Sequence, residues 1–595
     1  MKTHSGDIVE NKIIHQLFLK SEISWGVSDF SKAIGPMIDM VFISSYIGVN
    51  GVTVLGFISP LTMFFEVIGS AVANGARNMV SSMIGAGKLD DANRVFSDSL
   101  IMSGGLSILL ALLSFVFCPG LARILGAVDP EIAEMTQQYI LGYIIGFPFY
   151  TLTRVITPYL QIEGQYNRVN LTSILTTVID IVGDVLVVFV MLGSMFEIGL
   201  ATAIGYIIPF FVSAAYFMRK KNSHVFQLKI KGFSPKLCIK MFQLGAPMGI
   251  TKGSKALGGL IINNMLTAFN MPFLVAAYGV FSQITVFVRA AWYAPADTLM
   301  AFTGVFIGEE DRESIKYVQR ISLLHSLMMT SVVTVLLFLF CDSLASFFLR
   351  SDNPEALRLA EECIRVSCLS LPFHSIVYNF NNYLMGIKKL RLANIYSFLI
   401  ECGNLIPITL LMLRVIGYEG AWISKIANMV VLTLIAVIYI LSNKEGETFS
   451  DKMLLLPRNF GTTAYNEISI MADSVQDIER LSKIAIAFAM EHDASAKRAR
   501  NFGLVIEELS IFFAEHGFKD GMPHYINARL VAKDDDLIVR MRDDCQLLSL
   551  KEYYQLVKES QDKKDDEMNL SIIFKMSKDV EYTATFGANT LILKI

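Results

Sequence analysis

The stretch LGAVDPEIAEMTQQYI, residues 125–140, recurs later in the chain as LRSDNPEALRLAEECI, residues 349–364. The offset of 224 residues holds without a gap as far as Asn170 and Asn394. An earlier pair of segments, LGFISPLT and YGVFSQIT, repeats at an offset of 223 residues. The chain therefore contains two similar halves, an organisation that is common among membrane transporters.

Apolar segments of spanning length run through both halves. A transmembrane helix needs about 20 mostly apolar residues. Six segments in each half meet this requirement: residues 24–47, 53–84, 96–118, 132–158, 166–192 and 198–218, then 238–268, 273–302, 316–341, 357–385, 391–413 and 418–441. Because six is even, the halves share one orientation and should be related by an axis along the membrane normal. We predict an all-α polytopic membrane domain of two six-helix pseudo-symmetric lobes, 24–218 and 238–441, joined by a loop at 219–237.

The distribution of charge separates this membrane domain from the C-terminal part of the chain. Only 61 of the first 445 residues are charged, against 44 of the last 150. The whole chain is 53% hydrophobic and 18% charged, whereas soluble globular chains carry about 25% charged residues. These values exclude an ordinary soluble enzyme and a nucleic-acid-binding chain. The seven scattered cysteines form no C-x-x-C pair, which excludes the common zinc and redox motifs.

Basic residues predict the orientation in the membrane, because they concentrate in cytoplasmic loops. With the N-terminal segment 1–23 inside, the short inner loops hold fifteen Lys and Arg residues and the outer loops hold four. An even number of spans then places the C-terminal region inside as well. We therefore expect a multi-pass protein of the cytoplasmic membrane with both termini in the cytoplasm.

Acidic side chains inside the spans of the first half are candidates for ion coupling, since an ionisable group in a membrane is costly and usually functional. Asp39 lies in the first span, and Thr202 lies in the sixth. Asp180 and Asp184 lie in the fifth span at i, i+4, on one helical face. Hard cations need several oxygen ligands, and two close carboxylates tend to share a proton. Either property suits coupling to sodium ions or protons; helix capping or structural pairing is the alternative.

The second half carries a different set of charges. Lys252 and Lys255 lie in the seventh span, Arg289 in the eighth and Glu401 in the eleventh. They are candidates for the substrate cavity, where lysines favour anionic or zwitterionic compounds. The alternative is an intramembrane salt bridge, for example between a lysine and Glu401. The same two interpretations apply to charged residues of the second and fourth spans: Glu66, Arg77 and Arg154.

Four segments of the membrane domain resemble the multidrug and toxic compound extrusion (MATE) transporters. They are IDMVFISSYIGVNGVTVLGF in the first span, SSMIGAGKLDDANRVFSDSL before the third, IDIVGDVLVVFVM with IGLATAIG in the fifth and sixth, and GYEGAWISKIA before the last. The resemblance implies two lobes in a V shape and export of organic compounds by sodium or proton antiport. It places a cation site at Asp39, Asp180, Asp184 and Thr202; Asp180 departs from the family, which usually has Asn there.

The polar segment 442–463 predicts a linker to a soluble domain at 464–595. YNEISIMA alternates as a strand, two helical patterns come next, INARLVAKDDDLIVRMRDD indicates a hairpin, and YTATFGANTLILKI indicates two final strands. One sheet with helices on one face, an α+β two-layer sandwich, is the simplest packing of these elements.

The C-terminal domain resembles the histidine-kinase-like (GHKL) ATPase fold of anti-sigma-factor kinases, on IEELSIFFAEHG, MRDDCQLLSL and NLSIIFKMSKDVEYTATFGANTLILKI. The resemblance assigns nucleotide-binding roles to Glu508, His516 and Asp543. However, Phe512 replaces the magnesium-binding Asn, Cys545 replaces a glycine, and Asn-Leu-Ser replaces the glycine-rich phosphate turn. Magnesium needs oxygen ligands, and glycines let backbone amides approach phosphate. We therefore predict a degenerate regulatory domain without ATP hydrolysis or kinase activity.

The sequence thus predicts a secondary active exporter that is not an enzyme and needs no cofactor beyond the coupling ion. Its partners are a small-molecule substrate, membrane lipids and a regulatory protein at residues 464–595. No Walker A motif is present, which argues against a primary pump. Two alternatives remain: a flippase for a lipid-linked or anionic substrate that uses Lys252 and Lys255, and a membrane-bound sensor whose tail binds a signalling partner.

Overall fold

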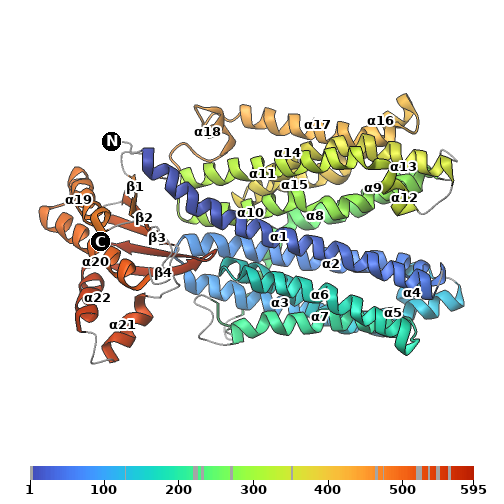
Figure 1. The fold of residues 1–595 in the computed structure, drawn as a ribbon, viewed down its shortest axis with the longest axis horizontal. Coiled ribbons are helices and arrows are strands. Elements are labelled where there is room, and N and C mark those ends of the chain that lie inside the picture. Colours follow the sequence, from blue (N-terminus) through green and yellow to red (C-terminus); the bar gives the residue numbers. More distant parts are fainter. Residues whose placement is uncertain are drawn as a thin grey trace.

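The computed structural model describes most of the chain. The described ranges are residues 4–47, 49–127, 129–218, 226–228, 233–268, 273–349, 353–461, 467–472, 475–517, 526–533, 536–543, 550–559 and 564–595. The described residues form a long helical domain and a smaller domain with a sheet (Figure 1). We call the end of the helices that adjoins the sheet the domain end, and the opposite end the far end.

Helices account for nearly all of the first part of the chain. In the first half they are α1 (His4–Tyr46), α2 (Val49–Gly85), α3 (Leu89–Val116), α4 (Cys118–Ile124), α5 (Pro130–Ile162), α6 (Tyr166–Leu186) with the π-helical turn η1 (Val187–Met191), and α7 (Met195–Met218). In the second half they are α8 (Pro235–Thr267), α9 (Leu274–Val288), α10 (Ala290–Gly308), α11 (Arg312–Leu339), α12 (Cys341–Leu349), α13 (Pro354–Ser367), η2 (Cys368–Ser370), α14 (Leu371–Gly386), α15 (Leu390–Phe398), η3 (Leu399–Gly403), α16 (Leu405–Ile416) and α17 (Gly420–Leu441). Each predicted span therefore falls on a helix or on a broken helix.

Eight of the described helices are long and apolar enough to cross a membrane, and α9 with α10 makes a ninth if this pair, bent by 46°, is one span. The other predicted spans coincide with α1, α8 and the α13–α14 pair, all of which carry several charged side chains. The residues from His4 up to the first predicted span are also helical and form the first part of α1.

The repeated stretch at residues 125–140 and 349–364 contains a helix start in both halves. Asp129 caps α5, and its carboxylate accepts hydrogen bonds from two backbone amides of the first turn. Asn353 caps α13 through its amide oxygen, which accepts one hydrogen bond, from the backbone N–H of Glu355. In both helices a proline occupies the first position, where its missing N–H costs nothing. The repeat D/N-P-E therefore encodes one capping device used twice.

The helices of the first half, α1–α7, touch those of the second half, α8–α17, closely at the domain end. Helix α2 packs along α8, and α10 packs against both α1 and α2. A Cβ on Gly75 of α2 would collide with the backbone of Met241 on α8, and a Cβ on Gly308 of α10 would collide with the backbone of α2 at Ser82. Farther from the domain end, Gly56 of α2 and Gly253 of α8 have no such neighbour within 4 Å among the described residues. The helices of the two halves therefore meet at the domain end and separate toward the far end.

The C-terminal domain comes after α18 (Phe449–Met453) and contains a five-stranded antiparallel sheet in the order β1-β2-β3-β5-β4. The strands are β1 (Glu467–Ala472), β2 (Ile526–Lys533), β3 (Asp536–Asp543), β4 (Asp579–Thr585) and β5 (Ala588–Lys594). The helices are α19 (Val475–Glu491), α20 (Ala496–Gly517), α21 (Leu550–Glu559) and α22 (Lys564–Met576). Apolar side chains of the helices and of one sheet face form a single core. The predicted hairpin and final strands are confirmed, with Lys533 paired to Asp536 at the hairpin end.

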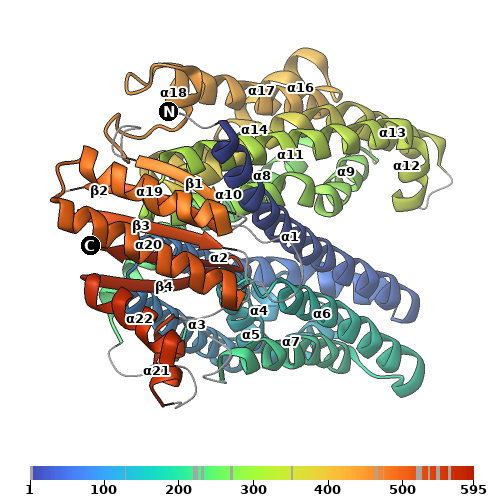
Figure 2. The same cartoon turned by 60° about the vertical axis from the view of Figure 1, so that its left-hand side comes forward.

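The other face of the sheet meets the domain end of the membrane helices (Figure 2). Along β2 and β3 alternate residues point to opposite faces, so Arg529, Arg540 and Arg542 lie on the face away from the domain's own core. Arg529 is directly opposite Arg540 in the register, and like charges in that position destabilise a sheet. Acidic residues between α10 and α11 compensate these charges. Arg542 pairs with Glu309 at 2.6 Å, and Arg529 pairs with Asp311 at 3.2 Å.

The tip of the β4–β5 hairpin inserts among the membrane helices. Phe586 and Gly587 form a two-residue turn with positive φ at both positions, a conformation that disfavours a bulky side chain. The Phe586 ring stacks on Phe302 of α10 with a centroid distance of 4.0 Å. Its backbone N–H donates to the carbonyl of Ile162 at 2.5 Å, and its carbonyl accepts from the Tyr166 hydroxyl at 3.1 Å. The hairpin therefore contacts helices of both halves.

Candidate functional site

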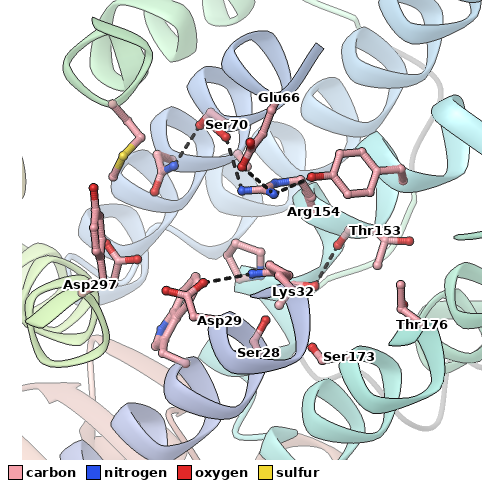
Figure 3. A pocket seen from close by; sticks show the side chains of 18 of the residues that line it. Ser28, Asp29, Lys32, Glu66, Ser70, Thr153, Arg154, Ser173, Thr176 and Asp297 are labelled. Carbon is pink, nitrogen blue, oxygen red and sulfur yellow. Dashed lines mark hydrogen bonds and ion pairs between the residues drawn. The ribbon is translucent and has the colours of Figure 1, made fainter. Parts of the chain in front are cut away.

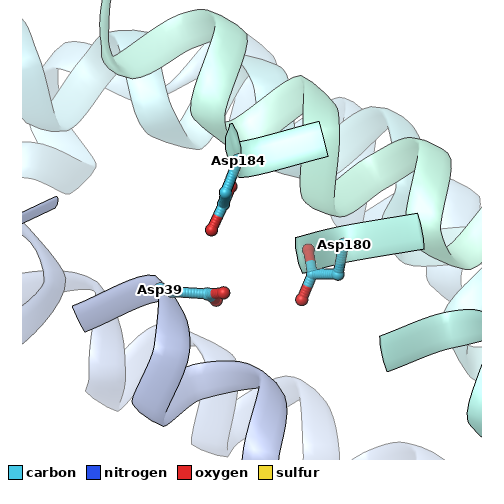
Figure 4. Close-up of side chains that lie close together, drawn as sticks. All are labelled: Asp39, Asp180 and Asp184. Atoms are coloured by element: carbon cyan, nitrogen blue, oxygen red, sulfur yellow. The ribbon is translucent and has the colours of Figure 1, made fainter. Parts of the chain in front are cut away.

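Three buried aspartates converge between α1 and α6. Asp180 and Asp184 are one helical turn apart on α6, and α1 packs along α6 so that Asp39 faces both (Figure 4). One carboxylate oxygen of each residue lies within 4.8 Å of those of the other two. All three side chains are at most 9% exposed.

The carboxylates of this cluster have few donors among the residues that the structure describes. Both oxygens of Asp184, and one oxygen each of Asp39 and Asp180, are buried without a hydrogen-bond partner. An unpaired buried carboxylate is costly unless a cation or a proton neutralises it. The arrangement can therefore hold a small cation or exchange protons.

The helices that carry the cluster are irregular beside it. Pro36 lies inside α1, three residues before Asp39, and it removes one intrahelical hydrogen bond. The π-helical turn η1 starts three residues after Asp184. Thr202 of α7 is buried and interacts with Asp180, and its hydroxyl donates to the Ile198 carbonyl at 3.4 Å. The structure thus places all four predicted coupling residues in one region, next to points where helices bend readily.

A second feature is a cavity of about 350 Å³ between the helices of the two halves, lined by both charged and apolar side chains (Figure 3). Residues of α1, α2, α5, α6, α7, α8, α9 and α10 line it. Its size is within the range of small-molecule sites in proteins, which is about 300–1,000 Å³. The cavity lies beyond the zone in which α2 and α8 touch, on the far-end side of Gly75.

Ion pairs across the cavity connect the two halves. Glu66 of α2 accepts from Lys252 of α8 at 2.6 Å and from Arg154 of α5 at 3.2 Å. Lys32 pairs with Asp29 within α1 at 3.3 Å. The salt-bridge interpretation of Lys252 is therefore correct, but its partner is Glu66 and not Glu401.

The remaining predicted cavity residues are placed differently. Lys255 and Arg289 line the cavity. Glu401 is not among the residues that line it; its carboxylate accepts a hydrogen bond from the Tyr378 hydroxyl at 2.5 Å. Asp297 also lines the cavity and pairs with Arg77 at 3.6 Å.

The predicted nucleotide-binding residues lie in the C-terminal domain. Glu508 is on α20, and Asp543 ends β3, where its carboxylate accepts from the Asn589 amide at 2.5 Å. The side chain of His516 and the residue Cys545 lie outside the described part of the chain. Phe512, at the expected magnesium position, is 4% exposed and packs edge-on against Tyr553. Burial raises the pKa of the Glu508 carboxyl above its ordinary value, and repulsion from the nearby acids Glu507 and Glu515 raises it further.

Comparison with known proteins identifies the membrane domain. The family model MatE matches residues 26–186 and 247–409, which together are more than half of the chain. The two matched segments correspond to the two halves of the repeat. The acid cluster lies in the first segment, and the C-terminal domain lies outside both.

Curated relatives and solved structures agree with this match. The probable multidrug resistance protein YoeA of Bacillus subtilis is 20% identical over 351 residues, 58% of this chain and 75% of that protein. The multidrug export protein MepA of Staphylococcus saprophyticus is 20% identical over 443 residues, 72% of this chain and 96% of that protein. An outward-facing structure of a multidrug resistance MATE family transporter superimposes with a TM-score of 0.67 at 18% identity, covering 70% of this chain and 93% of that one.

A repeated helical domain of spanning length, a cavity between its halves and a family match over more than half of the residues lead to one conclusion. The chain belongs to the MatE family of multi-pass membrane transporters.

Proposed function

We propose that this protein exports small organic compounds by antiport with sodium ions or protons, and that Asp39, Asp180 and Asp184 bind the coupling ion. The observation that carries this proposal is the cluster itself: buried carboxylates within 4.8 Å of one another and with too few donors among the described residues. Such a group is stable in a membrane only with bound positive charge.

The proposed topology has twelve spans in two six-helix lobes, with the domain end in the cytoplasm. The excess of basic residues in the loops of the domain end supports this orientation. The contacts of Gly75 and Gly308 then close the cytoplasmic side, and the cavity belongs to an outward-facing state. Export requires the opposite arrangement at another point of the cycle, in which α2 and α10 separate from their partners.

Ion binding would act on the helices that carry the cluster. A cation or proton between Asp39 and Asp184 removes the repulsion between α1 and α6. Pro36 removes one hydrogen bond of the helix, which lets the outer part of α1 bend toward α6. Asp29 and Lys32 line the cavity from the part of α1 that precedes Pro36, so this helix connects the ion site with the cavity. The shift between states cannot exceed the difference in the ion's affinity for them.

Transport measurements on the protein reconstituted in liposomes can identify the coupling ion. We expect efflux from liposomes to follow either an inward sodium gradient or an inward proton gradient when the two are imposed separately. Efflux that needs neither gradient would contradict antiport. Efflux driven only by ATP would also contradict it.

We propose that the C-terminal domain regulates transport by bridging the two lobes on their closed side. Phe586 contacts Ile162 and Tyr166 of one lobe and Phe302 of the other. Arg542 and Arg529 bind the acidic loop after α10, which must move when the cytoplasmic side opens. While docked, the domain therefore favours the outward-facing state, and its release would lower the barrier to the inward-facing one.

The docking should not respond to pH near neutrality. Burial opposes ionisation of Asp311, but the adjacent Arg529 and Arg542 outweigh this effect and lower the pKa of its carboxyl below the ordinary value of 3.8. A lowered pKa stabilises docking fully above pH 3.8, and this contribution is lost only as the pH falls through the lowered value. Hydrogen exchange in β2 and β3, corrected for intrinsic rates, should show equal protection at about pH 5 and about pH 7. Loss of protection at the lower pH would contradict this account.

The C-terminal domain is proposed to lack ATPase activity. With Phe512 buried where a magnesium ligand is expected, the domain has no side-chain oxygen at that position to hold the ion. Purified protein should release no phosphate from ATP above the background that the Glu508→Gln variant shows. Turnover in the wild type that disappears in Glu508→Gln would show that the domain is an active enzyme.

The two alternatives from the sequence receive less support. The relatives are named as multidrug resistance and export proteins, which favours export of small organic compounds over a flippase for lipid-linked sugars. A sensor without transport could use the cavity to bind its ligand, but it would not need a buried acid cluster. Transport of any small compound by the reconstituted chain would exclude the sensor.

A further inference from the structure

The cavity between the two lobes has a surplus of positive charge. Five cationic side chains line it: Lys32, Arg154, Lys252, Lys255 and Arg289. Three acidic side chains line it: Asp29, Glu66 and Asp297. A site that binds organic cations by charge would need the opposite balance.

Each of these three acids already has a cationic partner. Asp29 pairs with Lys32, and Glu66 is shared by Lys252 and Arg154. Asp297 pairs with Arg77, which does not line the cavity, so its charge is neutralised from outside. Among the described residues, no lining acid is therefore left to attract a cationic compound.

Two of the cations have no acidic partner within 4.0 Å among the described residues. Lys255 is exposed to the cavity from α8. Arg289 joins α9 to α10 at the bend, and its Nε is buried without a hydrogen-bond partner. Buried or partly buried cations seek anionic groups, and a guanidinium binds planar oxyanions in particular.

We propose that the transported compound is an organic anion, an aromatic or otherwise apolar body that bears a carboxylate or phosphate group. Lys255 and Arg289 bind the anionic group. Trp25, Tyr150 and Tyr293 line the same cavity and supply the apolar contact surface. Binding of an organic anion in the cavity does not depend on the proposed export function. Only the step that identifies the bound compound as the transported compound rests on it.

Equilibrium binding to the detergent-solubilised full chain tests this proposal without any ion gradient. Carboxyfluorescein and rhodamine 6G share one ring system and carry opposite charge, so fluorescence anisotropy compares charge at nearly constant shape. We expect carboxyfluorescein to bind about tenfold more tightly or better, equivalent to roughly 1.4 kcal/mol. Tighter binding of rhodamine 6G would overturn the proposal.

Substitutions then locate the site. Lys255→Gln and Arg289→Gln should each raise the Kd of carboxyfluorescein by about fivefold to tenfold, equivalent to roughly 1–1.4 kcal/mol for the loss of one charge contact. Lys444→Gln changes an exposed lysine just after α17, outside the cavity, and should leave the Kd unchanged. An unchanged Kd in both cavity variants would overturn the assignment, even if export is driven by ions as proposed.

A phosphate group can also come from a lipid headgroup, and competition separates the two sources. Displacement of carboxyfluorescein by benzoate but not by short-chain phosphatidylglycerol supports a soluble organic anion. Displacement by the lipid alone would reject it in favour of a headgroup site. Wild-type protein that binds carboxyfluorescein but shows no gradient-driven efflux would count against the coupling mechanism and not against this site.

Discussion

Replacing Asp184 by Asn should abolish gradient-driven efflux. The substitution keeps the shape of the side chain and removes the negative charge. Asp184 is the member of the cluster with both carboxylate oxygens buried and without hydrogen-bond partners among the described residues. The variant should therefore fold, and relief of an unpaired charge should even favour folding. What it loses is the affinity difference that lets an ion gradient bias the two states.

The expected magnitude is a fall in ion-driven efflux to less than about one tenth of the wild-type rate, which corresponds to a barrier higher by at least roughly 1.4 kcal/mol. Asp129→Asn is the matched control, because it makes the same chemical change at a helix cap, where Asn serves equally well. Carboxyfluorescein binding to Asp184→Asn should persist, since the residue does not line the cavity. Efflux at the wild-type rate in Asp184→Asn would reject the cluster as the coupling site.

The helices are predictable from the sequence because long apolar segments leave few alternatives in a membrane. Breaks within them are less visible. The segment 273–302 is long and apolar enough to be predicted as one span, and the charge of Arg289 alone does not predict that the helix bends there by 46°. Likewise, the i, i+4 spacing predicts that Asp180 and Asp184 share a face, but their approach to Asp39 depends on how α1 packs along α6.

Partners across the two halves cannot be predicted from local spacing. The sequence offers Glu401 of the same half as a partner for Lys252, yet Lys252 pairs with Glu66 of the other half, because α2 and α8 pack along each other. The docking of the C-terminal domain does have a sequence signal. RLVAKDDDLIVRMRD places arginines on one face of two adjacent strands, and GEEDRE comes after the eighth predicted span. The strand register is needed to show that these arginines lie on one face of the sheet, where they can pair with the acidic residues of the other segment.

Reversing the charge of Arg542 should release the C-terminal domain and speed transport. Arg542 is 13% exposed and Glu309 is 3% exposed, so Arg542→Glu would place two carboxylates together in a poorly hydrated site. Breaking such a pair costs about 3–5 kcal/mol, or a factor on the order of a hundred or more in the docking equilibrium. Because docking bridges the lobes on the side that must open, we expect a severalfold higher efflux rate at saturating substrate.

The double variant Arg542→Glu/Glu309→Arg restores opposite charges across the interface and should return both docking and the slower rate. Lys578→Glu breaks the exposed pair with Asp536 elsewhere in the domain and should change neither. Docking is measured separately, by hydrogen exchange in β2 and at the β4–β5 turn, so that each variant is first shown to be released or bound. If Arg542→Glu leaves the interface protected, Phe586→Ala removes the stacking on Phe302 and tests the same contact from the hairpin. A released domain with an unchanged or lower efflux rate would contradict a restraining role, because the free energy of docking would then not oppose the opening of the cytoplasmic side.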